Sequence, residues 1–277
     1  MTSTQSIKSM KLYTHVERVE RELDARGLGS DQMLEAEQLA DLDQLHYQGS
    51  KAVNEAIVEL ELGPGDRVLD VGAGLGGPAR ILAQNSGCQV TAVELQPDLN
   101  DLGASLTRRC GLARHIDHCC GDFLDMDLPS EGFDALVSWL TFLHIPENET
   151  LLTHCHRCLR PGGSIFIEDF YARPTLDAAQ RDLLASEVYC CDLPTLDQYR
   201  QQIESAGFSD LQMTDMTAPW QQFVRQRLDA FRQARPQFEA LHGGDAYCAL
   251  DHFYAVITGL FDSGGLGGLR WKARRPD

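Results

Sequence analysis

The sequence has few basic residues and no long apolar run. Lysines and arginines number 24 against 41 aspartates and glutamates, which gives a formal net charge of −17. Such a charge repels nucleic-acid phosphates and anionic membrane surfaces, so we expect neither as a partner and interpret the charge as a solvated surface. A membrane-spanning helix needs about 20 mostly apolar residues, and a secretory leader needs an apolar segment near its start. The sequence shows neither pattern, which predicts a cytoplasmic protein.

A second Cys-x-x-Cys pair is also missing. Nine cysteines are present, and Cys155 and Cys158 have the spacing of metal ligands, but no further pair completes a four-ligand zinc site. We therefore expect no metal and assign this pair to an ordinary helix before the fifth strand. The adjacent cysteines at 119–120 and 190–191 are expected to be free thiols, because free cysteine behaves as a small apolar residue.

The most informative segment spans residues 68–80, where a short apolar run ends in a glycine-rich turn. Such a run predicts a buried strand, and Gly72, Gly74 and Gly76 remove the Cβ atoms that would keep the backbone away from a ligand. The helix predicted to follow would point its first N–H groups at that ligand. Gly72, Gly74 and Gly77 also satisfy the G-x-G-x-x-G pattern of dinucleotide enzymes, so the glycines alone leave the cofactor open.

Acidic residues at the ends of predicted strands indicate which cofactor the site binds. Glu94 follows a strand at residues 89–93 and can accept hydrogen bonds from both hydroxyls of a ribose, a role that dinucleotide enzymes use as well. Asp122 follows a strand at residues 116–119 and can accept from an adenine amino group. Asp70 lies before the glycine turn, where it can order the loop and meet an ammonium group. The three acids together favour a site for S-adenosylmethionine (SAM).

These motifs resemble, in order, those of the class I SAM-dependent methyltransferases over residues 60–170. The matching segments are residues 68–76, Glu94, Asp122, residues 133–138 and residues 159–163. The resemblance implies an enzyme with SAM as its cofactor. The residues that it implies for SAM binding are Asp70, Gly72, Gly74, Gly76, Glu94, Leu95, Asp122, Phe123 and Trp139.

The alternation of apolar runs and helical stretches predicts an α/β fold with a Rossmann-like, doubly wound, mostly parallel sheet of about seven strands. The expected strands lie near residues 67–71, 89–93, 116–119, 134–138, 163–168, 210–215 and 267–273, and later helices near 176–188, 195–206, 218–234 and 245–262. Residues 264–268 are expected to form a flexible turn. We expect an N-terminal helical cap at 1–60, a SAM-binding core at 61–170, and a helical substrate-side insertion after the fifth strand with closing strands at 171–277. Within the cap, a break at residues 27–30 separates two helices, and the second begins at Asp31.

Residues 139–144, which follow the fourth strand and end in Phe-Leu-His, are similar to a segment of the phosphoethanolamine and the sarcosine/dimethylglycine N-methyltransferases. Residues 195–199, residues 206–208 and Trp271 extend this likeness along the chain. In such folds the acceptor lies above the carboxyl ends of the strands, so we expect it beside the fourth and fifth strands. The expected acceptor-binding residues are Leu140, Phe142, His144, Phe170, Tyr171 and Trp220.

His144 is the expected catalytic residue. A histidine, with an ordinary pKa of about 6.5, can take the proton that an amine loses when it accepts a methyl group. Tyr13 and Tyr47, on the predicted cap, could reach over the site and pair with it. The alternative is a structural histidine bonded to a backbone carbonyl. The other eight histidines are assigned no catalytic role, and His15, His46 and His115 are expected at the surface or at helix ends.

Two departures from these N-methyltransferases bear on the acceptor. They carry an aspartate four residues before the histidine, suited to hold an ammonium group, where this chain has Leu140. The tyrosines and basic residues that grip phosphate in the phosphoethanolamine enzymes are not matched either, which argues against phosphoethanolamine. The aromatic residues at the strand ends could instead surround a methylated ammonium or sulfonium, or simply pack in the core.

The leading hypothesis is a methyltransferase that acts on a small polar metabolite, by N-methylation of a glycine-betaine-type amine. One alternative keeps SAM and methylates the sulfur or oxygen of a small carboxylic acid, such as a methylthio acid. Another is a SAM-binding protein without catalysis. The sequence favours no particular oligomeric state.

Overall fold

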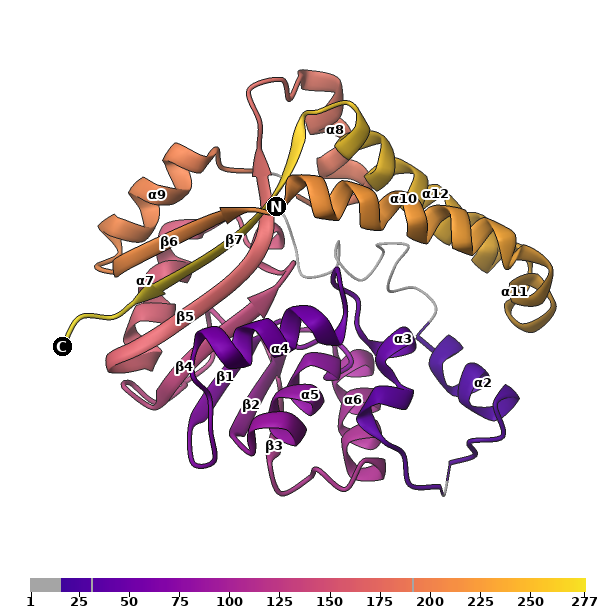
Figure 1. Cartoon of the computed structure of the whole chain (residues 1–277), viewed down its shortest axis with the longest axis horizontal. Coiled ribbons are helices and arrows are strands. Elements are labelled where there is room, and N and C mark those ends of the chain that lie inside the picture. The colour runs from indigo at the N-terminus through magenta and orange to yellow at the C-terminus, as the bar shows by residue number, and fades with distance from the viewer. Residues whose placement is uncertain (1–15, 31, 191) are drawn as a thin grey trace.

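The computed structural model describes residues 16–30, 32–190 and 192–277, which contain a seven-stranded sheet flanked by helices (Figure 1). The strands are β1 (Arg67–Val71), β2 (Gln89–Glu94), β3 (Ile116–Cys120), β4 (Phe133–Trp139), β5 (Leu159–Ala172), β6 (Ser209–Asp215) and β7 (Leu266–Arg274). Their order in the sheet is β3-β2-β1-β4-β5-β7-β6. The first five strands pair in parallel, whereas β7 lies antiparallel between β5 and β6. The predicted α/β fold with a mostly parallel sheet of seven strands is therefore confirmed.

Both faces of the sheet are covered, which explains the near-continuous apolar runs of its central strands. Successive side chains of a strand point to opposite faces. In β1, Leu69 and Val71 enter one hydrophobic core and Val68 enters the other. The helices that pack on the sheet are α4 (Ser50–Glu59), α5 (Gly77–Ser86) and α6 (Pro97–Arg109) on one face, and α7 (Asn148–Cys158) and α9 (Leu196–Ser205) on the other (Figure 1).

Four further helices follow β5 in the chain. They are α8 (Ala178–Glu187), α10 (Thr217–Gln233), α11 (Arg235–His242) and α12 (Gly244–Asp262). The long helices α10 and α12 lie side by side in the upper part of Figure 1, and together with α8 they share a hydrophobic cluster with Phe170 near the end of β5. The helices predicted near 218–234 and 245–262 are confirmed. The short α11 was not predicted; it spans only eight residues and begins at Arg235-Pro236, directly after α10.

The closing strand predicted at 267–273 is confirmed as β7, whereas the turn predicted at 264–268 is shorter than expected. Gly267 and Gly268 lie inside β7, which pairs with β5 from Ser164 to Ala172. A Cβ atom at Gly267 would overlap the ring of Tyr171, and one at Gly268 would overlap the ring of Trp220. These glycines therefore let aromatic rings lie flat against the strand.

The N-terminal region contains three short helical segments: α2 (Arg18–Ala25), the 3₁₀ helix η1 (Ala36–Gln38) and α3 (Ala40–Asp43). The predicted helix start at Asp31 is wrong, because residues 32–35 are not helical; Asp31 itself lies outside the described residues. The chain re-enters a helix only at η1, where the Glu35 N–H donates to the Gln38 side chain at 2.8 Å in a reciprocal cap. Since α2 packs near α6 and α4 packs on α5, the region covers one side of the core. Its treatment as a cap distinct from the core stays a prediction.

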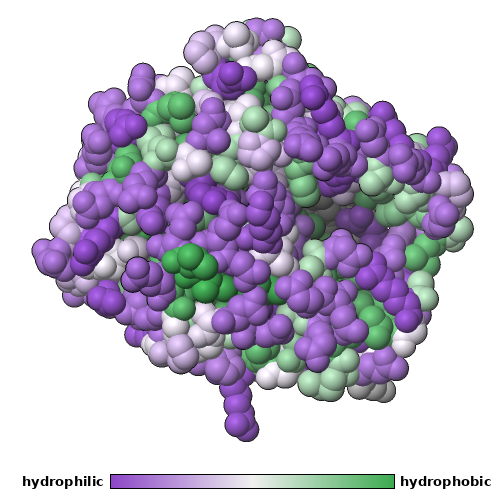
Figure 2. Space-filling model, viewed as in Figure 1, coloured by the Kyte–Doolittle hydropathy of each residue, from purple (hydrophilic) through white to green (hydrophobic). Residues whose placement is uncertain are grey.

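The described part of the chain has no helix that combines the length and the apolar content needed to cross a bilayer. Figure 2 shows a largely hydrophilic face, on which apolar residues form separate small groups. Exposed large apolar side chains include Met33, Val58 and Leu183. Cys155 and Cys158 lie buried in α7, at the predicted position before β5.

Candidate active site

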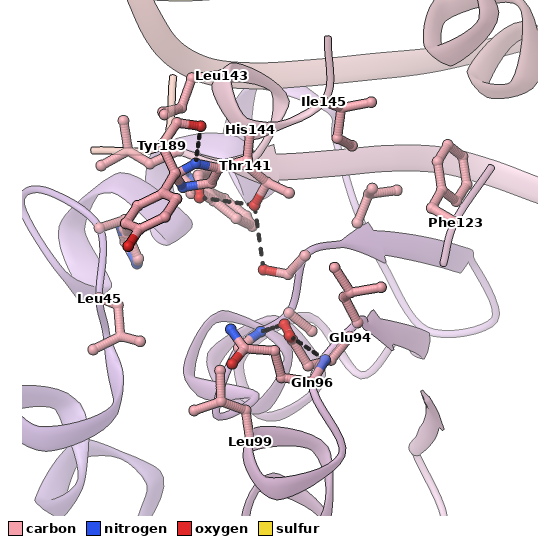
Figure 3. Close-up of a pocket in the computed structure, with 18 of the residues that line it drawn as sticks. Leu45, Glu94, Gln96, Leu99, Phe123, Thr141, Leu143, His144, Ile145 and Tyr189 are labelled. Atoms are coloured by element: carbon pink, nitrogen blue, oxygen red, sulfur yellow. Dashed lines mark hydrogen bonds between the residues drawn. The ribbon is translucent and has the colours of Figure 1, made fainter. Parts of the chain in front are cut away.

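A cavity of about 690 Å³ lies at the carboxyl ends of β1, β2 and β4. Its wall also includes residues 43–47, the end of β5, and side chains of α8, α10 and α12. The volume falls within the range of about 300–1,000 Å³ that is typical of small-molecule sites. In an open α/β sheet this edge is where ligands bind, so the position agrees with the predicted site. Figure 3 shows Glu94, Gln96 and Leu99 on one side of the cavity and Thr141, His144 and Tyr189 on the opposite side.

Glu94 ties the glycine turn to the end of β2. Its Oε2 accepts from the Gly74 N–H and its Oε1 accepts from the Gln96 N–H, both at 2.8 Å. The side chain is buried, which raises the pKa of this carboxyl, while the backbone hydrogen bonds act in the opposite direction. Each carboxylate oxygen can accept a second hydrogen bond, so ribose hydroxyls could still bind to Glu94.

Asp70 is buried at the cavity wall with an unsatisfied oxygen. Its side chain is 1% exposed and Oδ2 has no hydrogen-bond partner. Burial, and after it the charge of Glu94, raises the pKa of Asp70 to about 8. A buried polar atom without a partner is costly, and a cationic ligand group would supply the missing partner. The predicted contact with an ammonium group fits this environment.

The other predicted cofactor residues lie at the same edge. Leu95, Phe123 and Trp139 line the cavity and are buried or half-buried. Asp122 also lines it but is exposed, and its Oδ1 accepts from the Leu124 N–H at 2.9 Å. An exposed carboxylate at the rim can reach a ligand without a desolvation cost.

Some glycines of the turn are required by the backbone conformation and by neighbouring side chains, and not only by a ligand. Gly72, Gly74 and Gly76 all have φ between 55° and 78°, which residues with a Cβ adopt only at a cost. A Cβ at Gly72 would overlap the Thr141 side chain, and one at Gly76 would lie 2.8 Å from the His118 ring. Gly76 does not line the cavity, so its prediction as a cofactor-binding residue is not supported by its position. At Gly74 a Cβ would meet only Leu45, at 3.8 Å.

A buried ion pair, which sequence reasoning missed, holds residues 43–47 over the cavity. Arg80 of α5 is fully buried and donates to Asp43 Oδ2 at 2.6 Å and to the Leu75 carbonyl at 2.7 Å. It also donates to the Gly103 carbonyl at 3.1 Å. Burial raises the pKa of Asp43 to about 6, whereas the neighbouring guanidinium lowers it. The pair joins the N-terminal region to two helices of the core.

His144 lies on the acceptor side, in the 3₁₀ turn η2 (Phe142–His144) that follows β4. Its Nδ1 lies 3.4 Å from the Tyr189 carbonyl (Figure 3), so a proton on Nδ1 donates to that oxygen and Nε2 keeps its lone pair. Burial lowers the pKa of His144 to about 4, which makes the imidazole neutral at pH 7. Asp169 of β5 fixes the turn, because its Oδ2 accepts from the Leu143 N–H at 2.8 Å.

Leu140 holds an unusual backbone conformation beside this turn. Its φ is 54°, in the left-handed region, and its N–H donates to the Glu168 carbonyl at 2.8 Å. A leucine in this region costs of order 1–3 kcal/mol and persists where surrounding structure enforces it. Leu140 lines the cavity, as predicted for an acceptor-binding residue.

Three predicted acceptor residues do not line the cavity. Phe142 packs in the core, with its ring 6.5 Å from that of Trp271. Tyr171 points away because it neighbours Phe170 in β5, and adjacent strand residues face opposite sides. Trp220 is completely buried in the hydrophobic cluster behind Phe170. Of the aromatic residues predicted to bind the acceptor, only Phe170 lines the cavity.

Tyr47 lines the cavity within an aromatic cluster. Its ring lies 5.9 Å from that of Phe170 and 5.1 Å from that of Trp220. Burial raises the pKa of Tyr47 to about 12, so its hydroxyl stays protonated. The predicted pairing of Tyr47 with His144 stays a prediction, and Tyr13 lies outside the described residues.

His46 is a wall residue that sequence reasoning placed at the surface. It is 5% exposed, its ring lies 5.6 Å from that of Trp139, and burial lowers its pKa to about 4. Its Nδ1 lies 3.0 Å from the Tyr47 carbonyl. No local pattern marks this residue, because its burial comes from segments that are distant in the sequence.

Arg227 is a second wall residue that was missed, although the sequence contains a signal for it. It is half-buried on α10, three residues after the buried Val224 and seven after the buried Trp220. This spacing puts the arginine on the inner stripe of the helix.

Comparison with known proteins finds a family match over part of this chain. Residues 69–167 match the family described as "Methyltransferase domain". The chain is 28% identical over 191 residues to phosphoethanolamine N-methyltransferase 1 of Arabidopsis thaliana, which covers 69% of this chain and 38% of that protein. It is 32% identical over 158 residues to sarcosine/dimethylglycine N-methyltransferase of Halorhodospira halochloris. That match covers 57% of this chain and 56% of the relative. The chain thus spans well under two thirds of these relatives.

Solved structures share the fold. Haemonchus contortus phosphoethanolamine N-methyltransferase 2 in complex with S-adenosyl-L-methionine has a TM-score of 0.78 at 21% identity, over 94% of this chain and 60% of that one. A cyclopropane synthase from Mycobacterium tuberculosis has a TM-score of 0.66 at 16% identity, over 81% of this chain and 83% of that one. Since differently named enzymes share this architecture, the acceptor has to be argued from the cavity.

Proposed function

We propose that this chain, whose residues 69–167 form a methyltransferase domain, transfers the methyl group of SAM to the nitrogen of a small polar amine. The resemblance to phosphoethanolamine and sarcosine/dimethylglycine N-methyltransferases that the motifs indicate is confirmed by the relatives above. The observation that carries the proposal is the neutral His144, which faces the cavity across from Glu94. Its Nδ1 bond to Tyr189 leaves Nε2 as a hydrogen-bond acceptor.

The acids of the opposite wall fit the cofactor. Bound SAM supplies an electrophilic methyl group on a sulfonium. Asp70 would pair with its ammonium, Glu94 would accept from the ribose hydroxyls and Asp122 would accept from the adenine amino group. The cavity is walled by protein on several sides, so these charged contacts act with reduced competition from water.

His144 then acts on the amine. It accepts a hydrogen bond from the amine N–H, which turns the nitrogen lone pair toward the methyl group. The nitrogen forms a bond to the methyl carbon while the carbon–sulfur bond breaks, and its electron pair stays on the neutral thioether. Nε2 receives the amine proton. Because the pKa of His144 is near 4 in the ligand-free cavity, its main contribution is orientation, and a bound anion would raise its basicity.

The test is the formation of S-adenosylhomocysteine (SAH) from SAM with sarcosine as acceptor, a secondary amine whose neutral form keeps an N–H for His144. His144→Ala is expected to lower kcat about a hundredfold, because an acceptor that loses its alignment reacts about that much more slowly, while SAH affinity measured by calorimetry stays unchanged. His252→Ala is a matched control, because this histidine is exposed on α12 and pairs with Glu187 at 3.1 Å. Full activity of His144→Ala would contradict the proposed role.

A second candidate follows from Leu140, the apolar residue that stands in place of the family aspartate. Without an ammonium clamp, the acceptor could be the sulfur or oxygen of a small carboxylic acid. A thioether sulfur or a carboxylate oxygen has no proton to lose, so turnover of 3-methylthiopropionate would not depend on His144. Rates of wild type and His144→Ala with each acceptor distinguish the two candidates. A protein that forms no SAH with either acceptor class would instead fit a SAM-binding role without catalysis.

A further inference from the structure

Arg227 is the one cationic side chain among the described residues that line the cavity. The other ionisable wall residues are the carboxylic acids Asp43, Asp70, Glu94, Asp122, Asp125 and Glu147, the imidazoles of His46 and His144, and the phenols of Tyr47 and Tyr189. All of these acids except Glu147 lie at the cofactor end, at the edge of β1 to β3 or in residues 43–47; Glu147 follows η2. Arg227 comes from α10, on the side where Phe170 and Tyr47 form the wall.

Aromatic rings surround the guanidinium on several sides. Its Cζ lies 4.5 Å from the ring centre of Tyr254, 5.1 Å from that of Tyr47 and 5.5 Å from that of Phe223. Ring faces attract a cation and hold the planar group in one orientation, so the side chain is ordered before a ligand arrives. The rings offer no charge that would neutralise it.

No carboxylate of the described residues lies within 4.0 Å of Arg227, unlike Arg225, Arg232 and Arg235 of the same region, which all have acidic partners. Its Nε is buried and has no hydrogen-bond partner. A desolvated donor on a charged group is costly unless a ligand or another residue satisfies it. The protein thus keeps an ordered cation with unused hydrogen-bonding capacity at the wall of an otherwise acidic cavity.

We propose that Arg227 binds a carboxylate of the methyl acceptor and so selects carboxylate-bearing amines or thioethers over neutral ones. This inference rests on the proposed function, because only a methyltransferase would use the bound carboxylate as a methyl acceptor. A guanidinium binds a carboxylate through two parallel N–H donors, which sets orientation as well as affinity.

A carboxylate fits this site better than a phosphate monoester. A carboxylate carries one negative charge, which the single guanidinium balances, whereas a phosphate monoester carries about −1.5 to −2 at pH 7. The nearby wall offers Phe253, Ile257 and Val188 rather than a second cation. The surrounding acids would repel the excess negative charge.

Binding at Arg227 also decides which end of the acceptor reacts. The guanidinium occupies the neighbourhood of the Tyr47 ring, so a substrate ammonium or sulfonium is repelled from that corner. The carboxylate turns toward α10, and the nucleophilic atom turns toward the wall that holds His144 and the acids that would bind the cofactor. An acceptor without a carboxylate loses this alignment.

The test measures binding with SAH-saturated protein, so it does not depend on turnover. Calorimetry compares dimethylglycine with dimethylglycinamide and 3-methylthiopropionate with its amide, in wild type, Arg227→Met and Arg227→Lys. Methionine keeps the length and the apolar contact with the rings but removes the charge and the donors. Arg225→Met is the matched control on the same helix, because Arg225 is exposed and pairs with Asp262 at 2.8 Å.

Wild type is expected to bind at least one carboxylate more tightly than its amide. Arg227→Met should weaken binding of that carboxylate about ten- to a hundredfold, leave the amide unchanged, and leave SAH affinity and the unfolding midpoint at wild-type values. Arg227→Lys should lose less, and Arg225→Met should change nothing. A role confined to packing α10 against α12 would move carboxylate and amide together.

Three outcomes would overturn the proposal: an unchanged carboxylate preference in Arg227→Met, no carboxylate that binds more tightly than its amide in wild type, or phosphoethanolamine binding that exceeds the carboxylates and depends on Arg227. A failure of the proposed function would give a different result. If carboxylate binding depends on Arg227 but no probe yields SAH from SAM, the binding site stands and the methyl-transfer assignment falls.

Discussion

Asp70→Asn is expected to change how the stability of the ligand-free protein depends on pH. In the folded protein the pKa of Asp70 is raised to about 8 from its usual 3.8, because the carboxyl is buried and lies near Glu94. Between these values the folded state holds a proton that the unfolded state has released. The free energy of unfolding of wild type therefore falls as pH rises through this window.

The magnitude follows from the same two pKa values. Between about pH 5 and pH 8 the folded state is penalised by about 1.4 kcal/mol for each pH unit, which gives an upper limit of about 4 kcal/mol. Water in the open cavity screens the charge, so we expect a change of about 2–4 kcal/mol. Asparagine does not titrate, so the substitution itself changes the free energy of unfolding by an amount that does not depend on pH.

Urea unfolding at about pH 5, 7 and 9 measures this effect for wild type and Asp70→Asn. The stability difference should grow in favour of the variant with rising pH and level off above about pH 8. Asp101→Asn, an exposed acid on α6, serves as the control and should run parallel to wild type. Parallel curves for wild type and Asp70→Asn would refute the assignment of a protonated Asp70.

The same group should couple cofactor binding to proton release. If the ammonium of SAH pairs with Asp70, binding favours the charged carboxylate and releases up to about one proton per site at pH 7. Calorimetry in two buffers of different ionisation enthalpy measures that proton count. Asp70→Asn should weaken SAH binding and abolish the release; a release that persists in the variant would assign the proton to another group.

Three further experiments test the site's framework. Glu94→Ala should weaken SAH binding by about 1.5–3 kcal/mol, the range of hydrogen bonds to a charged group, and an unchanged calorimetric affinity would contradict the ribose assignment. Arg80→Met should destabilise the fold by about 3–5 kcal/mol in urea because it leaves the buried Asp43 without its partner, and adding Asp43→Asn should recover part of that loss if the ion pair is the cause. Gly72→Ala should cost more than Gly74→Ala by at least about 1 kcal/mol. Both positions have a positive φ, but a Cβ at Gly72 would overlap Thr141, whereas one at Gly74 would lie 3.8 Å from Leu45, so equal melting temperatures would contradict the clash.

The sequence by itself determined the central sheet and the cofactor edge. Mostly apolar runs of strand length mark β1, β2 and β4, and the acids Asp70, Glu94 and Asp122 stand at or just after the ends of β1, β2 and β3, so local spacing is enough to put them at one edge. Parallel strands connected by helices end on the same side of a sheet, which converts a linear order of motifs into a shared site.

Only the tertiary structure decided the composition of the acceptor wall. The strand face that each residue occupies separates Phe170, which lines the cavity, from Tyr171, which does not, and this depends on the register of β5 with β7. His46 and Arg227 enter the wall from segments far from the glycine turn, and no local pattern reveals that they meet. Long-range packing brings such residues together, so their role emerges from contacts between helices that the sequence places more than a hundred residues apart.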